Sequence, residues 1–436
     1  MSNEAGAGET PQADIAMGEA QDQASIAPVT AAERIASLDF IRGVAVMGIL
    51  AANIVAFGQP FTAYMYPDAF LTEHGPVSDW LLVLQFVVID NKMRGLFTLL
   101  FGAGLYLFME RTWARGGTRW RQMWRLTVLL LFGAIHFYFI WMGDILMYYA
   151  MIGFAVVPML RWSAKTQFGI ALTGYVAGIL FYAAFVSFPY LIAETDMGDA
   201  VTFTEAREQL AAGKLEDIER SAEATELKME GDFIGLVEFR LANHAFDPFS
   251  NIFFFAFESL PLMLLGVALY RMGFFSGGFE RRTLIRWGWI GLALGGLMSL
   301  AIALWLKAGG FTYYAMLAGF VAWTPLPQLM MVLGMAALLV AYSPQWTGWL
   351  GQRISAAGRA AFTNYLGTSI LMIFVFQGWG LGLFGEFARP GLYLVTFLTW
   401  CLMLAWSKPW LERYRYGPLE WLWRSMTYGR LFALKR

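Results

Sequence analysis

Two side chains that could move a proton stand eight positions apart, His136 and Asp144 in the run GAIHFYFIWMGDILMYYA. A histidine beside a carboxylate can act as a general base or a proton relay near neutral pH. The spacing crosses a turn between two apolar runs, so it permits contact without requiring it. A histidine that is hydrogen-bonded for packing alone is the alternative interpretation. We therefore take His136 and Asp144 as candidate catalytic residues.

Other ionisable residues accompany this pair. His74 has acidic neighbours in the sequence and is a second candidate catalytic histidine, with a solvated loop residue as the alternative. Glu258, in FFFAFESLPLMLLG, is a carboxylate within an apolar run, which is costly unless the charge is paired. It is a candidate for proton transfer, and a structural ion pair with Arg94 or Arg240 is the alternative.

A second group of polar residues stands at the mouths of apolar runs. The segments SLDFIRG, GRAAFTNYLG and GPLEWLWRSMTYGR carry arginines, which bind phosphate or carboxylate through paired hydrogen bonds. The alternative is an ion-pair network that fixes the C-terminal tail and contacts anionic lipid. Candidate ligand-binding residues in these segments are Asp39, Arg42, Arg359, Asn364 and Arg424, with Asn53 added from the apolar run after SLDFIRG and Arg94 from the polar stretch DNKMR.

The composition is that of a membrane protein. Of 436 residues, 58% are hydrophobic and 14% charged, whereas soluble domains have about 45–50% apolar and about 25% charged residues. The net charge of −1 argues against binding to nucleic acid. One cysteine excludes an internal disulfide and a thiolate metal site. Without a Walker loop, ATP-driven transport by this chain alone is not expected.

Apolar runs of about 20 residues predict an all-α polytopic fold of about ten transmembrane helices. Polar residues interrupt the second run at 90–94 and two prolines interrupt the eighth, so we expect broken helices at both places. The predicted spans are 37–58, 79–111, 121–141, 144–160, 166–189, 249–270, 286–306, 311–342, 360–384 and 390–407.

Lysine and arginine gather in alternate connections, above all 111–125, 271–286 and the C-terminal tail. This bias predicts that both termini of a multi-pass protein of the cell (inner) membrane are cytoplasmic. Segment 191–248 holds 14 acidic and 5 basic residues and is expected outside, with a helix from Glu205 to about Leu227. The predicted parts are a disordered tail (1–33), a five-span half (34–190), the acidic outer loop (191–248), a second five-span half (249–407) and a cytoplasmic tail (408–436).

Six motifs in order resemble the YeiB-like family, named as domain of unknown function 418: RIASLDFIRGVAVMGILAANI, LFTLLFGAGLYLFMER, AIHFYFIWMGDILMYYAMIG, LPLMLLGVALYRMGFF, GRAAFTNYL and GPLEWLWRSMTYG. That family is distantly similar to membrane acyltransferases of the acyltransferase-3 and heparan-glucosaminide acetyltransferase types. Acyltransferase-3 proteins carry an arginine and, eleven positions later, a histidine in the first helix. Here Arg42 matches but Asn53 replaces the histidine, so the resemblance implies that His74 or His136 takes that role.

Three functions are compatible with these features. An acyltransferase would bind a cytoplasmic acyl-CoA-type donor at the arginines and deliver the acyl group through His136 to an outer acceptor. A proton-coupled transporter of a small molecule would use His136 and Glu258 as relays. A non-catalytic scaffold in the lipid bilayer would need neither residue.

Overall fold

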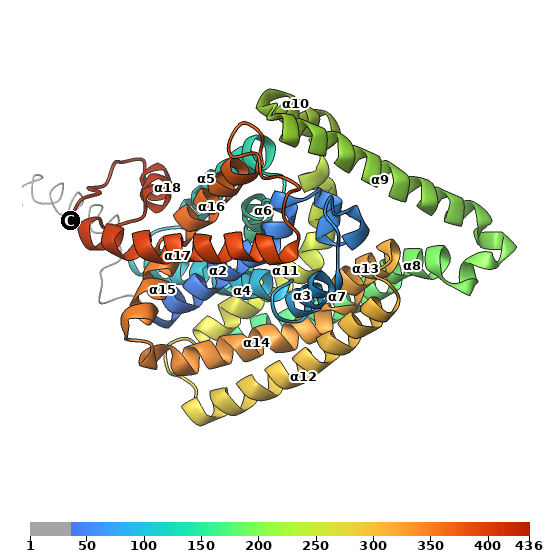
Figure 1. Cartoon of the computed structure of the whole chain (residues 1–436). Coiled ribbons are helices and arrows are strands. Elements are labelled where there is room, and N and C mark those ends of the chain that lie inside the picture. Colours follow the sequence, from blue (N-terminus) through green and yellow to red (C-terminus); the bar gives the residue numbers. More distant parts are fainter. Residues whose placement is uncertain (1–35) are drawn as a thin grey trace, which may run out of the picture.

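A computed structural model describes residues 36–436, so the predicted disordered tail lies outside the described residues. Within this range the chain is built from helices, and its one β-bridge joins Tyr414 to Lys435 (Figure 1). In the described part of the chain, eight helices are long and apolar enough to cross a membrane, or nine if one bent pair forms a single span. The predicted class, an all-α polytopic membrane protein, is confirmed.

The helices of the first half follow the predicted spans with one shortened member. The fourth predicted span is a short apolar helix, Leu146–Arg161, rather than a full-length one. The elements are α2 (Ala36–Gly58), α3 (Pro76–Val88), α4 (Lys92–Ala114), α5 (Trp120–Ile135), the π-helical turn η4 (His136–Ile140), α6 (Leu146–Val156), η5 (Val157–Arg161), α7 (Ala164–Phe185) and α8 (Ser187–Glu194).

The acidic segment and the second half are also helical. The stretch predicted from Glu205 to about Leu227 is one long helix, α9. The elements are α9 (Thr204–Glu230), α10 (Phe233–Asn243), α11 (Asp247–Arg271), α12 (Arg281–Ala308), α13 (Tyr313–Ala318), the π-helical turn η8 (Gly319–Trp323), α14 (Pro325–Tyr342), α15 (Trp349–Arg359), α16 (Ala361–Phe376), α17 (Arg389–Arg413) and α18 (Pro418–Tyr428).

Both predicted breaks are present, and each has a local cause. The second predicted span divides into α3 and α4 at Asn91, whose φ of 61° no regular helix accommodates. The eighth divides at η8, after which Pro325 stands in the first turn of α14 and needs no backbone donor. A third break bends α15 against α16 by 85°.

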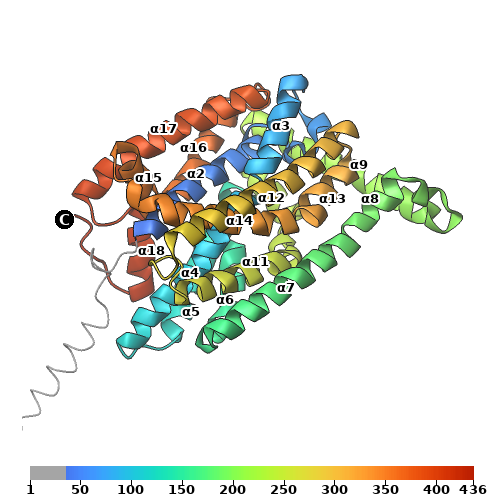
Figure 2. The ribbon, with the colours of Figure 1, turned by 90° about the horizontal axis from the view of Figure 1, so that it is seen from below.

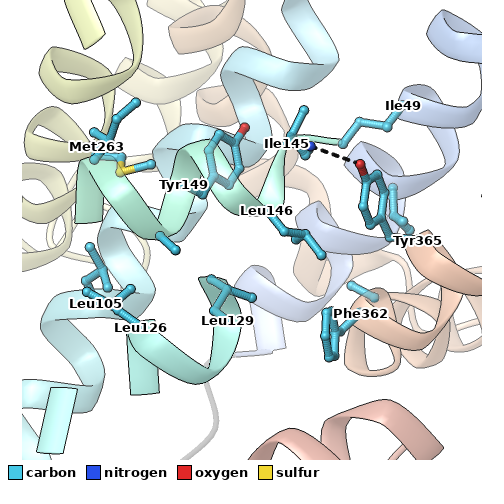
Figure 3. Packing of buried hydrophobic residues seen from close by; sticks show 14 of the residues in the cluster. Ile49, Leu105, Leu126, Leu129, Ile145, Leu146, Tyr149, Met263, Phe362 and Tyr365 are labelled. Atoms are coloured by element: carbon cyan, nitrogen blue, oxygen red, sulfur yellow. Dashed lines mark hydrogen bonds between the residues drawn. The ribbon is translucent and has the colours of Figure 1, made fainter. Parts of the chain in front are cut away.

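The packing interleaves helices that are distant in the sequence. α11 packs against α4, α6 and α7, while α2 packs against α15, α16 and α17. The α4–α11 contact depends on Gly102, where an added Cβ would lie 1.9 Å from the carbonyl oxygen of Met263. Small residues allow membrane helices to approach this closely. Figure 3 shows the core between these elements, with Met263, Leu105 and Tyr365 among its members.

The bundle has two chemically different ends. Figures 1 and 2 both show α18 and the C-terminus at one end, and α8 and α9 at the opposite one. We call them the basic end, which holds α18 and the 111–125 connection, and the loop end, which holds α9 and α10. Of the candidate site residues, Arg424 therefore lies at the basic end, on α18.

Candidate functional site

His136 and Asp144 are in contact. The Nδ1 of His136 lies 2.7 Å from Oδ1 of Asp144, and both side chains are fully buried. The second oxygen, Oδ2, accepts the backbone N–H of Met147 at 2.7 Å, which fixes the carboxylate at the start of α6. Since a carboxylate accepts, Nδ1 carries the hydrogen. The other ring nitrogen, Nε2, is buried and has no hydrogen-bond partner among the described residues.

A π-helical turn positions His136. The backbone of His136 accepts the N–H of Trp141, five residues on, at 2.6 Å, so this turn is wider than an α-turn. Such turns are rare and are frequent at functional sites. The ring centre of Tyr365 on α16 lies 5.3 Å from that of His136. Tyr365 is fixed because its hydroxyl accepts the N–H of Ile145 at 3.2 Å (Figure 3).

A cavity of about 340 Å³ opens at the basic end and reaches Tyr365 and Leu146. Its inner walls are apolar and come mainly from α4, with Phe97, Phe101 and Leu105 among the lining side chains. Its charged lining is strongly basic, since two carboxylates, Asp39 and Glu420, stand against Arg42, Arg111, Arg115, Arg125, Arg359, Arg415 and Arg424. The cavity can accept a ligand with an anionic head and an apolar chain.

The tail helix α18 forms one wall of this cavity. The carboxylate of Glu420 accepts the N–H groups of Phe362 at 2.7 Å and Thr363 at 3.1 Å, where α16 begins. It also accepts the Thr363 hydroxyl at 2.5 Å. Burial raises the pKa of this carboxyl above its ordinary value. The Trp423 indole donates to the carbonyl of Arg125 at 3.1 Å, and the Arg125 guanidinium lies 4.5 Å from the Trp423 ring centre.

The predicted arginine cluster is partly assembled. Asp39 and Arg42 form an ion pair at 2.9 Å, and both line the cavity with Arg359 and Arg424. Arg111, Arg115, Arg125 and Arg415 also line it but were absent from the predicted site. Their signal is present in the basic connection 111–125 and in the first part of the tail, where the sequence pattern predicts only the orientation of the chain.

Asn364 and Asn53 do not line the cavity. Asn364 donates to the carbonyl of Ala357 at 3.0 Å and to Ser407 at 3.2 Å, and it accepts the indole N–H of Trp406 at 2.9 Å. It therefore holds the α15–α16 bend against α17. Asn53 is half-buried on α2.

His74 has a different environment from His136. Its Nδ1 lies 3.0 Å from Asp79, and its Nε2 accepts the Nε–H of Arg389 at 3.0 Å. Burial and the charge of Arg389 lower the pKa of His74. Because both ring nitrogens are engaged, His74 has no lone pair left to accept a proton from a substrate.

Glu258 and Arg94 form an ion pair at 2.8 Å, and Gln328 donates to the same carboxylate at 2.7 Å. Asn91 accepts from Arg94 at 3.2 Å. Of the two partners considered for Glu258, Arg94 is the one in contact. Neither residue lines the cavity. Across residues 36–436, no group of three or more histidine, cysteine or acidic side chains could hold a metal ion.

Comparisons with known proteins place the chain in a family. A family model described as "Protein of unknown function (DUF418)" matches residues 269–430. The chain is 32% identical over 402 residues to the uncharacterized protein YeiB of Escherichia coli K12, covering 91% of this chain and 96% of YeiB. It is 29% identical over 420 residues to the uncharacterized protein YxaH of Bacillus subtilis 168, covering 93% and 96%. No solved structure matches the chain significantly. The extent of the YeiB match shows that the chain belongs to the YeiB-like DUF418 family of multi-pass membrane proteins.

Proposed function

We propose that this protein transfers an acyl group from a cytoplasmic thioester donor of the acyl-CoA type to a hydroxyl or amine acceptor. In this proposal the basic end faces the cytoplasm, as the lysine and arginine bias predicts. One observation carries the proposal. Tyr365 lines the arginine-lined cavity, and its ring centre lies 5.3 Å from that of His136, which stands behind it and does not itself line the cavity; the Nε2 of His136 has no partner in the described chain.

The lining of the cavity suits the parts of such a donor. Arginines bind phosphate groups through paired hydrogen bonds, and seven of them line the cavity. The aromatic and leucine side chains of α4 suit a pantetheine arm and a short acyl chain. With this orientation, the nucleotide would remain near the arginines while the thioester lies near Tyr365.

The chemistry requires one base and one hydrogen-bond donor. Nε2 of His136 would take the proton from the acceptor hydroxyl as its oxygen bonds to the thioester carbonyl carbon. As the carbon–sulfur bond breaks, the imidazolium would return that proton to the leaving thiolate. Asp144 would hold the Nδ1–H and stabilise the imidazolium. Tyr365, whose hydroxyl accepts from Ile145, still has its own hydrogen to donate to the carbonyl oxygen.

The hydrogen bonds made by the ring nitrogens of the two histidines favour His136 over His74 as the base. His74 already accepts a hydrogen bond from Arg389 at Nε2. Protonating that nitrogen would place a second positive charge against a buried guanidinium. His136 has no such neighbour on its free nitrogen.

The test uses the purified full chain in detergent. Coenzyme A at millimolar concentration should raise its melting temperature, and a short acyl-CoA supplied with a hydroxyl acceptor should release free thiol. His136→Gln should lower thiol release about 100-fold or more, as expected for loss of a general base. His244→Gln is the matched control and should retain the rate. Absence of both stabilisation and thiol release would refute the proposal.

A proton-coupled transporter is the second candidate, because the partly buried Arg94–Glu258 ion pair lies beside the α13–α14 break. The side chain of Gln328 on α14 donates a hydrogen bond to the carboxylate of Glu258, and the Asn91 side chain donates to the carbonyl of Phe320 within η8 at 2.9 Å. Carboxylates near broken helices are typical of coupled carriers. Uptake into liposomes that requires a pH gradient and is lost in Glu258→Gln would support this function over acyl transfer.

A further inference from the structure

Two cations are buried at the loop end, away from the arginine-lined cavity. Lys228 lies near the end of α9 and Arg240 near the end of α10, the two helices that pack together there. The exposed fractions are 9% for Lys228 and 2% for Arg240. Burial lowers the pKa of Lys228, and the positive charge of Arg240 on the adjacent helix lowers it further.

Neither cation has an anionic partner among residues 36–436. Ion pairs within 4.0 Å join Arg207 to Asp199 and Arg220 to Glu216 in this part of the chain, but none includes Lys228 or Arg240. Nη1 of Arg240 is buried without a hydrogen-bond partner. The carboxylate of Asp247, at the start of α11, is paired with His244 at 2.8 Å.

Lys228 contacts an aromatic ring and a backbone connection rather than a carboxylate. Nζ of Lys228 lies 4.9 Å from the ring centre of Phe384. The carbonyl of Lys228 accepts the N–H of Gly378 at 2.8 Å, which attaches α9 to the 378–385 connection. A ring face offers a cation far less stabilisation than a carboxylate does. Two like charges held in this way are unfavourable unless an anion joins them.

We propose that Lys228 and Arg240 form a binding site for a small oxyanion, a phosphate or carboxylate group, at the loop end of the bundle. A guanidinium and an ammonium can together give such a group paired and single hydrogen bonds. The same chemistry fits a free anion and an anionic lipid headgroup. The assignment does not depend on the acyltransfer proposal, because these residues belong to a different end of the molecule.

The test measures anion-dependent melting of the purified full chain. Inorganic phosphate is titrated in detergent, and in a second arm the protein is reconstituted in nanodiscs of phosphatidylcholine with or without phosphatidylglycerol. We expect stabilisation in at least one arm: phosphate in detergent identifies a free anion, and phosphatidylglycerol identifies a headgroup. Lys228→Met and Arg240→Gln should each reduce the affinity at least tenfold.

The controls separate this site from non-specific charge effects. Lys214→Met and Arg207→Gln remove the same charges from α9, at positions where Lys214 contacts tyrosine rings and Arg207 is exposed. Both should keep the anion response. Because Lys228→Met also removes an unpaired buried charge, it should melt at the same or a higher temperature than the unsubstituted chain without anion. No anion response in either arm, or an equal response in Lys228→Met and Arg240→Gln, would overturn the proposal.

Discussion

Replacing Glu420 with alanine should release the tail helix from the bundle. The carboxylate accepts two backbone N–H groups at the start of α16 and the Thr363 hydroxyl, and without it these donors have no partner from α18. Each buried donor left unsatisfied costs about 1–3 kcal/mol. Two backbone donors, with partial compensation by water, imply a loss of about 3 kcal/mol in docking energy.

This loss has a measurable consequence because each 1.4 kcal/mol is about a tenfold change in an equilibrium. About 3 kcal/mol would make opening of α18 about 100-fold more frequent, provided that α18 opens independently of the bundle. Hydrogen exchange followed by mass spectrometry should show faster exchange over 418–428, while α4 and α11 stay protected. Glu420→Gln, which keeps one acceptor oxygen for the backbone, should show a smaller effect.

The refuting result is equally specific. If Glu420→Ala leaves exchange in 418–428 unchanged, then capping by Glu420 does not hold the tail and the cavity wall must depend on Trp423 and its neighbours. If α4 and α11 also lose protection, then α18 does not open separately from the core. Arg430→Gln is a control near the end of the tail and should leave the exchange unaltered.

Three further predictions concern the stability of the bundle in detergent. Gly102→Ala should lower the free energy of unfolding by about 1–3 kcal/mol by overpacking, because the new Cβ would meet the Met263 carbonyl. Gly104→Ala is the control and should not lower it, since an added Cβ there has nothing within 4 Å. Equal melting temperatures of the two variants would contradict the close α4–α11 contact. Glu258→Gln should cost about 1–3 kcal/mol by breaking a partly buried ion pair. Adding Arg94→Met should recover part of that loss, so additive losses in the double variant would argue against the pair. Burial lowers the pKa of Lys228 from 10.5 to about 7 in the folded chain. Between pH 7 and pH 10.5 the unfolded chain therefore binds more protons than the folded chain, so the contribution of Lys228 to the free energy of unfolding rises with pH over this range. Measured against Lys228→Met, this contribution should increase by up to about 1.4 kcal/mol per pH unit, and a flat difference would refute the shift.

Much of the architecture was predictable because a bilayer requires long apolar helices whose backbone bonds are internal. The runs around 37–58, 249–270 and 286–306 became α2, α11 and α12 with small changes at the ends. The broken second and eighth runs were also predictable, since polar residues and prolines act locally. The shortening of the fourth span could not be predicted. Its helix α6 has only eleven residues, and helices as short as this or as the six-residue α13 are stabilised by packing rather than by length.

The candidate site was less accessible from the sequence. His136 and Asp144 could be selected as residue types at a permissive spacing, but their contact depends on the π-helical turn and on the start of α6. The arginines of 111–125 were visible as charge and not as cavity lining. Asn364, a predicted ligand-binding residue, hydrogen-bonds across the bend between α15 and α16, which no local pattern indicates.

The sequence by itself determined the membrane class, the order of the helices and the chemical types present at each end, because hydropathy and charge are properties of single segments. Only the tertiary structure decided that the tail helix completes an arginine-lined cavity and that Lys228 and Arg240 are both buried. It also decided that, within residues 36–436, His136 rather than His74 keeps a ring nitrogen without a hydrogen-bond partner. Those outcomes depend on the register and rotation of helices far apart in the chain. No local pattern encodes them, since each requires two or more distant side chains to meet.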